Sequence, residues 1–237
     1  MMDTKTFIDN YRKAFGEKAE LPVAFWYSEQ AVAQTTREGH CIFQRLNDVR
    51  QGKSISLTAE NLPCGGGKFY CGFTEMPAFV PTFVSVKERY KEPPQLVEDM
   101  LEEIGVPRTE SNFLNFARID EIESFEEAEG LLFYATPDML SGLVTWATFD
   151  NNSPDAVSSL FGSGCANVVT FTVIENSKGG HRCFLGLFDP SARPYVESNM
   201  MSFTIPMSRF RVMYDTMPQS CLFDTHAWEK IRERINQ

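Results

Sequence analysis

The sequence predicts an α+β fold, with one compact domain built around a mixed sheet over residues 1–237. Segments with apolar residues at helical spacing are interspersed with short apolar or alternating runs typical of strands. The 237 residues, 43% of them hydrophobic, are enough for a substantial core. No low-complexity segment and no Pro/Ser-rich linker divides the chain.

In the first half, apolar residues at helical spacing from Phe7 to Phe15 predict a helix that Asp3 or Thr6 caps. The segment 83–90 gives no clear assignment. The other elements expected here are a buried strand over 22–28, a helix over 41–50 that ends at Gly52, an alternating strand over 54–58, and a helix over 95–104 that Gly105 closes.

In the second half, Thr136-Pro137 is expected to open a helix to about residue 148, since proline is favoured at the first helical position. Ser153-Pro154 is expected to open another, to about residue 161. In 162–174 the β-branched content favours a strand and the Gly-Ser-Gly lead-in a helix; we expect a helix. The remaining expected elements are strands over 113–119, 131–135, 182–188 and 201–205, and helices over 206–214 and 225–235.

The charge of the chain bears on its partners. The formal net charge is −10 and the pI is about 4.9, which argues against nucleic acid, because phosphate binding needs a positive face. Acidic residues concentrate in 119–129, which we interpret as a solvated face or loop, with a protein-docking surface as the alternative. A homo-oligomer is compatible with the sequence.

Targeting signals and cysteine usage suggest a compartment. The N-terminal residues contain no apolar signal region, and no segment reaches the ~18 apolar residues of a membrane helix. We therefore expect a cytoplasmic protein without a membrane partner, in which the six cysteines are mostly reduced. The 20 phenylalanines are scattered along the chain, which predicts a Phe-rich core.

The order of elements also suggests a degenerate duplication of one α/β unit, with pseudo-repeats at 21–75 and 130–195. Each begins with an aromatic strand, continues to a cysteine that precedes a helix-like stretch, and ends with a strand and a loop. Cys41 then corresponds to Cys165, and the loop at Cys64 to the loop at Arg193. Two such units are expected to place these features around one shared crevice.

The segment 61–73 carries the most informative local pattern, because Cys64 and Cys71 bracket three glycines and Lys68. It matches neither the P-loop nor the dinucleotide-binding pattern, since Phe69 follows Lys68 and Tyr70 takes the last glycine position. An anion could still sit on successive backbone N–H groups from Gly65 to Lys68.

Metal and thiol chemistry are two further interpretations. Cys64 and Cys71 lie too far apart for a zinc pair, but a site from Cys41, Cys64 and Cys165 would suit a soft metal or an iron–sulfur cluster. Alternatively, Cys41 and Cys165 at helix starts would favour the thiolate, as would Lys68 beside Cys64. Plain burial competes with both, because free cysteine packs as a small hydrophobe.

The sequence supports two hypotheses for function. In the first, one pocket binds a small molecule, an anion or a metal, and an anionic group would meet Lys68 or Arg193. The residues assigned to it are Cys64, Gly65, Gly66, Gly67, Lys68, Gly164, Cys165 and Arg193, with Cys41, Cys64 and Cys165 as metal ligands. In the second, the chain is a non-catalytic interaction protein with buried cysteines. Whether it is an enzyme stays open.

The chain resembles the uncharacterised ArCR family, known as domain-of-unknown-function family 169. The resemblance depends on the order of several short motifs and spans most of the chain. They are Leu21-Pro22-Val23-Ala24-Phe25, Leu62-Pro63-Cys64-Gly65-Gly66-Gly67, Cys71-Gly72-Phe73, Thr136-Pro137-Asp138, Gly164-Cys165-Ala166, Gly186, Ala192-Arg193 and Ile205-Pro206. Membership implies a cysteine-containing globular domain and supplies no mechanism.

Overall fold

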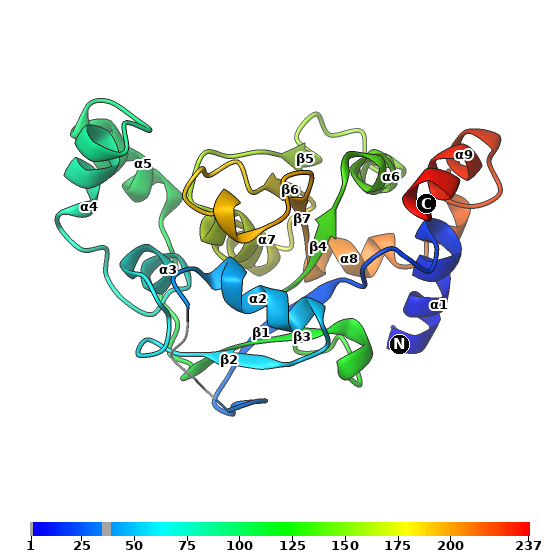
Figure 1. The fold of residues 1–237 in the computed structure, drawn as a ribbon, viewed down its shortest axis with the longest axis horizontal. Coiled ribbons are helices and arrows are strands. Elements are labelled where there is room, and N and C mark those ends of the chain that lie inside the picture. The colour runs from blue at the N-terminus through cyan, green and yellow to red at the C-terminus, as the bar shows by residue number, and fades with distance from the viewer. Residues whose placement is uncertain (1, 35–38) are drawn as a thin grey trace.

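The protein is built around one seven-stranded sheet, in a computed structural model that describes residues 2–34 and 39–237 (Figure 1). The strand order is β2-β3-β1-β4-β7-β6-β5. The strands are β1 (Val23–Ser28), β2 (Ile55–Leu57), β3 (Phe113–Arg118), β4 (Gly130–Ala135), β5 (Val157–Ser158), β6 (Cys183–Gly186) and β7 (Met201–Pro206). All neighbours are antiparallel except β5 and β6, which are parallel. The predicted α+β fold with a mixed sheet is confirmed.

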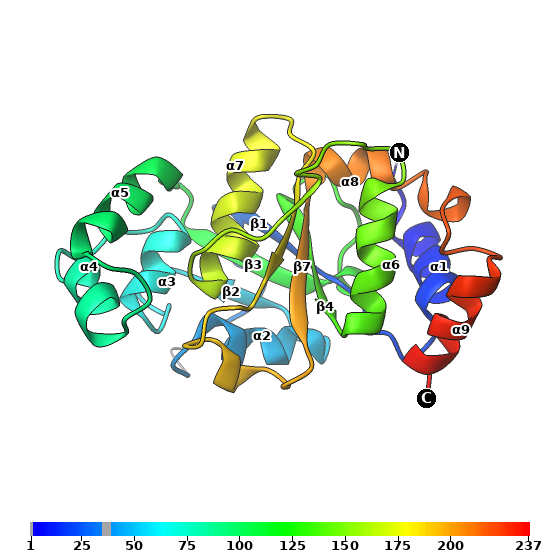
Figure 2. The same ribbon diagram turned by 90° about the horizontal axis from the view of Figure 1, so that it is seen from above.

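Helices cover both faces of this sheet (Figure 2). They are α1 (Thr4–Phe15), α2 (Ile42–Arg50), α3 (Gly65–Tyr70), α4 (Val80–Thr82), α5 (Pro94–Ile104), α6 (Pro137–Thr148), α7 (Phe171–Ser177), α8 (Met207–Met213) and α9 (His226–Ile235). A π-helical turn, Phe83–Lys87, follows α4, and another, Ala166–Thr170, leads into α7. No helix among the described residues is long and apolar enough to cross a membrane.

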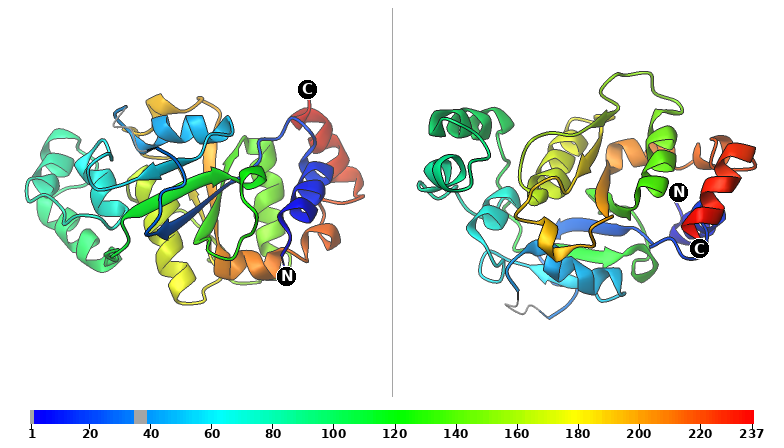
Figure 3. Two further views of the ribbon diagram at one scale, coloured as in Figure 1. Left: turned by 90° about the horizontal axis from the view of Figure 1, so that it is seen from below. Right: turned by 45° about the horizontal axis from the view of Figure 1, so that its top comes forward.

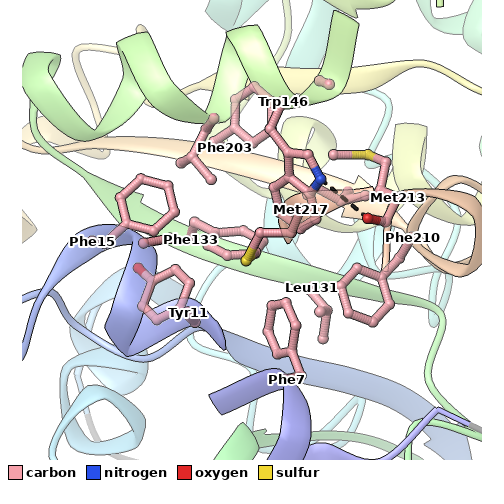
Figure 4. Packing of buried hydrophobic residues seen from close by; sticks show 14 of the residues in the cluster. Phe7, Tyr11, Phe15, Leu131, Phe133, Trp146, Phe203, Phe210, Met213 and Met217 are labelled. Atoms are coloured by element: carbon pink, nitrogen blue, oxygen red, sulfur yellow. Dashed lines mark hydrogen bonds between the residues drawn. The ribbon is translucent and has the colours of Figure 1, made fainter. Parts of the chain in front are cut away.

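The sheet separates two hydrophobic cores, because successive side chains of a strand point to opposite faces. In β4, Leu131 and Phe133 join a first core with α1, α6, α8 and α9, whereas Leu132 and Tyr134 join a second core with α2, α3 and α7. The first core is rich in aromatic rings (Figure 4). Phenylalanine supplies ten of the twelve largest fully buried side chains in the described part of the chain, which confirms the predicted Phe-rich core.

Several helix ends confirm the capping signals read from the sequence. The Asp3 carboxylate accepts a hydrogen bond from the backbone N–H of Thr6, 2.6 Å away, and so caps α1. Gly105 closes α5 in the left-handed conformation, with φ of 60°. The first and last helices, α1 and α9, lie side by side, where the Trp228 indole N–H donates to the carbonyl oxygen of Ala14 (Figure 3).

The prediction of a helix over 153–161 is wrong. The segment instead contains the short strand β5, which pairs with β6, and the backbone N–H of Cys183 donates to the carbonyl oxygen of Ala156 at 2.8 Å. Ala156 is buried, but Leu160 and Phe161 are exposed, so the segment has no apolar face to bury as a helix. By contrast, the contested segment 162–174 is helical as expected, and four of its β-branched residues are buried, namely Val168, Val169, Thr170 and Thr172.

Apart from the edge strand β5, the strand order is symmetric about the pair of β1 and β4. Moving outward, β3 and then β2 follow β1, while β7 and then β6 follow β4. In both halves a helix with a cysteine at its start precedes one of these strands. The helix α2 begins directly after Cys41 and precedes β2, and the helix that leads into α7 contains Cys165 in its first turn and precedes β6. This arrangement is compatible with a duplication of 21–75 and 130–195, which stays a prediction.

Candidate functional site

A cavity of about 640 Å³ lies on the side of the sheet that carries α2, α3 and α7. One wall is a helical lobe, residues 77–104, formed by α4, the following π-helical turn and α5, which Figures 1 and 2 show beside α3. The opposite wall is made by the loops 159–163 and 188–192. The floor consists of Cys41, Phe43, Cys64, Gly65, Gly66, Gly67, Tyr70, Gly164 and Cys165.

The cavity brings together most of the residues predicted for one shared crevice. Cys41 at the start of α2, Cys64 at the start of α3 and Cys165 near the start of the helix leading into α7 all line it. Gly65, Gly66, Gly67 and Gly164 line it as well. Lys68 and Arg193 are not among the lining residues, although both were predicted to meet the ligand.

The three glycines form the first turn of α3. Cys64 is its N-cap residue, and the Cys64 sulfur accepts a hydrogen bond from the backbone N–H of Gly67 at 3.2 Å. None of the three glycines has a positive φ, so the backbone conformation itself does not require glycine. Each glycine in a helix costs roughly 0.5–1 kcal/mol relative to alanine. The three glycines therefore destabilise α3, and the backbone conformation does not explain their presence.

Steric crowding explains Gly67 and Gly164 but not Gly66. A Cβ atom on Gly67 would lie 3.2 Å from the sulfur of Cys64, a tight contact, and 3.9 Å from that of Cys165, an ordinary one. A Cβ on Gly164 would lie 2.4 Å from the ring of Phe43. A Cβ on Gly66, in contrast, would meet no atom within 4 Å. The space above Gly66 belongs to the cavity, so its glycine leaves the α3 backbone open to an incoming molecule.

We expect Gly66→Ala to raise the free energy of unfolding by roughly 0.5–1 kcal/mol, because alanine favours the helix and meets no neighbour. Denaturant unfolding would measure this. The matched control is Gly142→Ala in α6, where the new Cβ would lie 2.2 Å from the ring of Trp228 and should lower stability. Equal effects of the two substitutions would contradict the prediction.

Burial raises the pKa of two floor thiols, Cys41 and Cys165, and so favours their protonated form. It raises the pKa of Cys41 to about 11, although hydrogen bonds from the backbone N–H groups of Phe43 and Gln44 act in the opposite direction. It raises the pKa of Cys165 well above its usual range, and the nearby Cys71, Cys41, Cys64 and Asp189 add to the effect. The sequence-based expectation of thiolates at these helix starts is therefore wrong, because desolvation outweighs the helix N-terminus.

Asp189 is a cavity residue that the sequence analysis missed. One of its carboxylate oxygens accepts from the backbone N–H of Gly164 at 3.2 Å, at the start of the helix leading into α7. The other accepts from the Ser191 backbone N–H at 2.9 Å and hydroxyl at 2.8 Å. The protein thus places its own carboxylate at the start of this helix. The signal was an Asp-Pro-Ser turn, in which aspartate commonly bonds the backbone two residues later.

Arg193 has a structural role in the same loop. Its guanidinium donates to the backbone carbonyl oxygens of Glu197 at 3.1 Å, Ser198 at 2.7 Å and Met200. These three bonds hold the chain between the short helical turn at Arg193–Tyr195 and β7. The guanidinium is therefore engaged with backbone carbonyls, outside the cavity lining.

Exposed apolar side chains surround the mouth of the cavity. Phe79 and Phe83 project from the helical lobe with exposed fractions of 65% and 43%. Leu160, Phe161 and Phe188 stand on the opposite wall, 39%, 48% and 57% exposed. The π-helical turn at Phe83–Lys87 contributes to the first wall, and such turns often occur at functional sites. The sequence analysis did not single out these residues, because an isolated apolar residue carries no sign of where the chain will place it.

A comparison with protein families matches residues 13–216 to the model of the uncharacterised ArCR family, DUF169. The match covers all the residues that line the cavity. The chain belongs to this family. The family resemblance predicted from the ordered motifs is therefore confirmed. No curated protein and no solved structure matches the chain.

For this ArCR protein the metal site stays a prediction. Cys41, Cys64 and Cys165 line one cavity, yet within 2–34 and 39–237 no three His, Cys, Asp or Glu side chains form a group suited to hold a metal ion. All six cysteines are free thiols, and Cys64 is the exposed one among them. The cavity itself is shaped less like a metal centre than like a pocket for an organic molecule, with apolar walls and few polar groups.

Proposed function

We propose that this ArCR protein binds a small, mainly apolar organic molecule in the cavity, in contact with the Cys64 thiol and the open backbone of α3. A volume of about 640 Å³ falls in the range of pockets for drug-sized molecules. The packing of the protein gives no other reason for a glycine at position 66, because a Cβ atom there would meet no neighbouring atom within 4 Å.

The observation that carries the proposal is the concentration of exposed apolar side chains at one place. Ten large apolar side chains are exposed among the described residues, and five of them line this cavity. Contiguous exposed apolar surface on a folded domain generally marks a binding site. A ligand between the two walls would remove these side chains from water, at roughly 25 cal/mol for each Å² buried.

Fluorescence of diphenylhexatriene, a neutral apolar dye that becomes bright on leaving water, tests the proposal. We expect saturable binding at one dye per chain. Gly66→Leu, which fills the space above α3, should weaken this binding at least about tenfold. Phe161→Ala should weaken it by a factor of about three to ten, as expected for the loss of roughly 1 kcal/mol of apolar contact.

Phe149→Ala is the matched control for Phe161→Ala. Phe149 is 46% exposed at the end of α6 and does not line the cavity, so its removal should leave the affinity unchanged. If the native protein, Gly66→Leu and Phe161→Ala all bind the dye with equal affinity, the dye binds outside the cavity. That result would then favour the interaction-protein hypothesis for the exposed apolar side chains.

A further inference from the structure

The charged side chains that line the cavity are all acidic. Glu88 in the helical lobe and Asp189 on the opposite wall both line it. Among the described residues that line it there is no lysine, arginine or histidine. An anionic ligand would therefore enter without a counter-charge in the lining and would meet two carboxylates.

Asp189 lies close enough to the floor to affect several groups there. Its charge contributes to raising the pKa of Cys41, Tyr70 and Cys165, together with burial. It also contributes to the raised pKa of Tyr90 on the lobe, where burial and a hydrogen bond with Glu88 act in the same direction. The charge of Asp189 thus acts on groups on both sides of the cavity, and such a charge opposes a further negative charge nearby and favours a positive one.

Aromatic faces provide the second half of a cation site. Seven aromatic side chains line the cavity: Phe43, Tyr70, Phe79, Phe83, Tyr90, Phe161 and Phe188. The protein already places one cation against this lining, because the Lys91 ammonium lies 4.7 Å from the ring centroid of Phe161. Aromatic rings combined with carboxylates are the usual recognition elements for organic ammonium ions.

We propose that the ligand carries a positive charge, as an organic ammonium or related cation on an apolar body. This inference rests on the proposed function and specifies the ligand class of the same cavity. The apolar body would lie between the walls and over Gly66, while the cationic group would be near Asp189 and Glu88, facing aromatic rings. The opposite expectation, an anionic ligand, depended on Lys68 and Arg193, and neither lines the cavity.

Three dyes with the same apolar body test the sign of the charge. They are diphenylhexatriene, its trimethylammonium derivative and its propionate derivative, compared at about 0.15 M salt so that distant charges are screened. We expect the trimethylammonium dye to bind at least about tenfold more tightly than the propionate dye, with the neutral dye between them.

Charge-neutral variants locate the effect. In the double variant Asp189→Asn, Glu88→Gln, the preference should fall below about threefold. The control variant Asp9→Asn, Glu229→Gln makes the same change in net charge at exposed positions on α1 and α9, away from the cavity. It should leave the preference for the cationic dye unchanged. Glu88 is exposed, so the single variant Glu88→Gln should leave the fold intact. It should show a partial loss of the preference for the cationic dye even if the Asp189 substitution disturbs its loop.

The outcomes separate the two proposals. If the neutral dye binds but the propionate dye binds as tightly as the cationic one, the inference is overturned and the apolar pocket stands. The inference also fails if both sets of charge variants behave alike, since the preference would then reflect net charge. If none of the three dyes binds, the proposed function fails and the inference fails with it.

Discussion

Replacing Phe210 with alanine should lower the free energy of unfolding by roughly 3–5 kcal/mol, the usual cost of removing a fully buried aromatic side chain. This is the largest change in stability that we expect from a single substitution in this chain. Urea or guanidinium unfolding, followed by circular dichroism, would measure it.

The size of the effect reflects the contacts of the ring. Phe210 in α8 packs edge-on against Phe7 of α1, with ring centroids 4.9 Å apart, and against Phe125 at 5.2 Å. Trp146 of α6 and Tyr214 complete the cluster, with ring centroids 6.5 Å and 6.0 Å from that of Phe210. Figure 4 shows Phe7, Trp146 and Phe210. The substitution would therefore leave a void where three helices meet, and such surroundings cannot collapse fully.

The control for Phe210→Ala is Phe149→Ala, which removes a ring of the same size from a 46% exposed position and should cost less than about 0.5 kcal/mol. Because Phe210 belongs to the core opposite the cavity, the folded fraction of Phe210→Ala should bind diphenylhexatriene with native affinity. A cost below about 1 kcal/mol would contradict the packing described for this cluster.

The helices and strands were predictable where local chemistry determines them. Asp3, Thr136-Pro137 and Gly105 act through capping and backbone preference, which depend on a few neighbouring residues. The helix predicted from Ser153-Pro154 failed although it carries a similar signal. The two segments differ in their apolar residues, because those after Thr136 bury an apolar face on the sheet, whereas Leu160 and Phe161 remain exposed.

The candidate site was predictable only in part, for a similar reason. The predicted repeats paired Cys41 with Cys165 and the Cys64 loop with the Arg193 loop around one crevice, and the cavity does bring the three cysteines together. Charge could not be assigned in this way. Arg193 and Asp189 lie four residues apart in one loop, and only the folded loop shows that the arginine binds carbonyls while the carboxylate lines the cavity.

The walls of the cavity could not be predicted, because they depend on long-range arrangement. Phe79 and Phe83 come from the connection between β2 and β3, whereas Phe161 and Phe188 come from loops that follow β5 and β6, at the other end of the strand order. The sheet also separates the aromatic core from the cavity. One face packs the aromatic core around Phe210, and the core on the other face lies beneath the cavity.

Thiol labelling should distinguish Cys64 sharply from the other floor cysteines. Cys64 is exposed in the cavity, whereas Cys71 and Cys165 are buried and the pKa of Cys41 is raised to about 11. Since the thiolate is the reactive form, only about one thousandth of Cys41 is reactive at pH 8. We expect maleimide to modify Cys64 at least about a hundredfold faster than Cys41 at this pH.

The pH dependence gives an independent check. Labelling of Cys41 should accelerate about tenfold for each pH unit and level off only near pH 11, because its thiolate fraction grows in this way below the pKa. Peptide mapping after short exposures, with circular dichroism to confirm that the fold persists, would measure both rates. Cys41 labelling as fast as Cys64 at pH 8 would contradict the burial described here.

Ligand binding should then protect one thiol selectively. A saturating concentration of diphenylhexatriene should slow the labelling of Cys64 severalfold, because both occupy the space beside Gly66. Cys221 lies outside the cavity and serves as the internal reference, whose rate should not change. Protection of Cys64 alone would link the exposed thiol, the open backbone of α3 and the apolar walls to a single bound molecule. Equal protection of both cysteines would show that the dye acts on the protein as a whole.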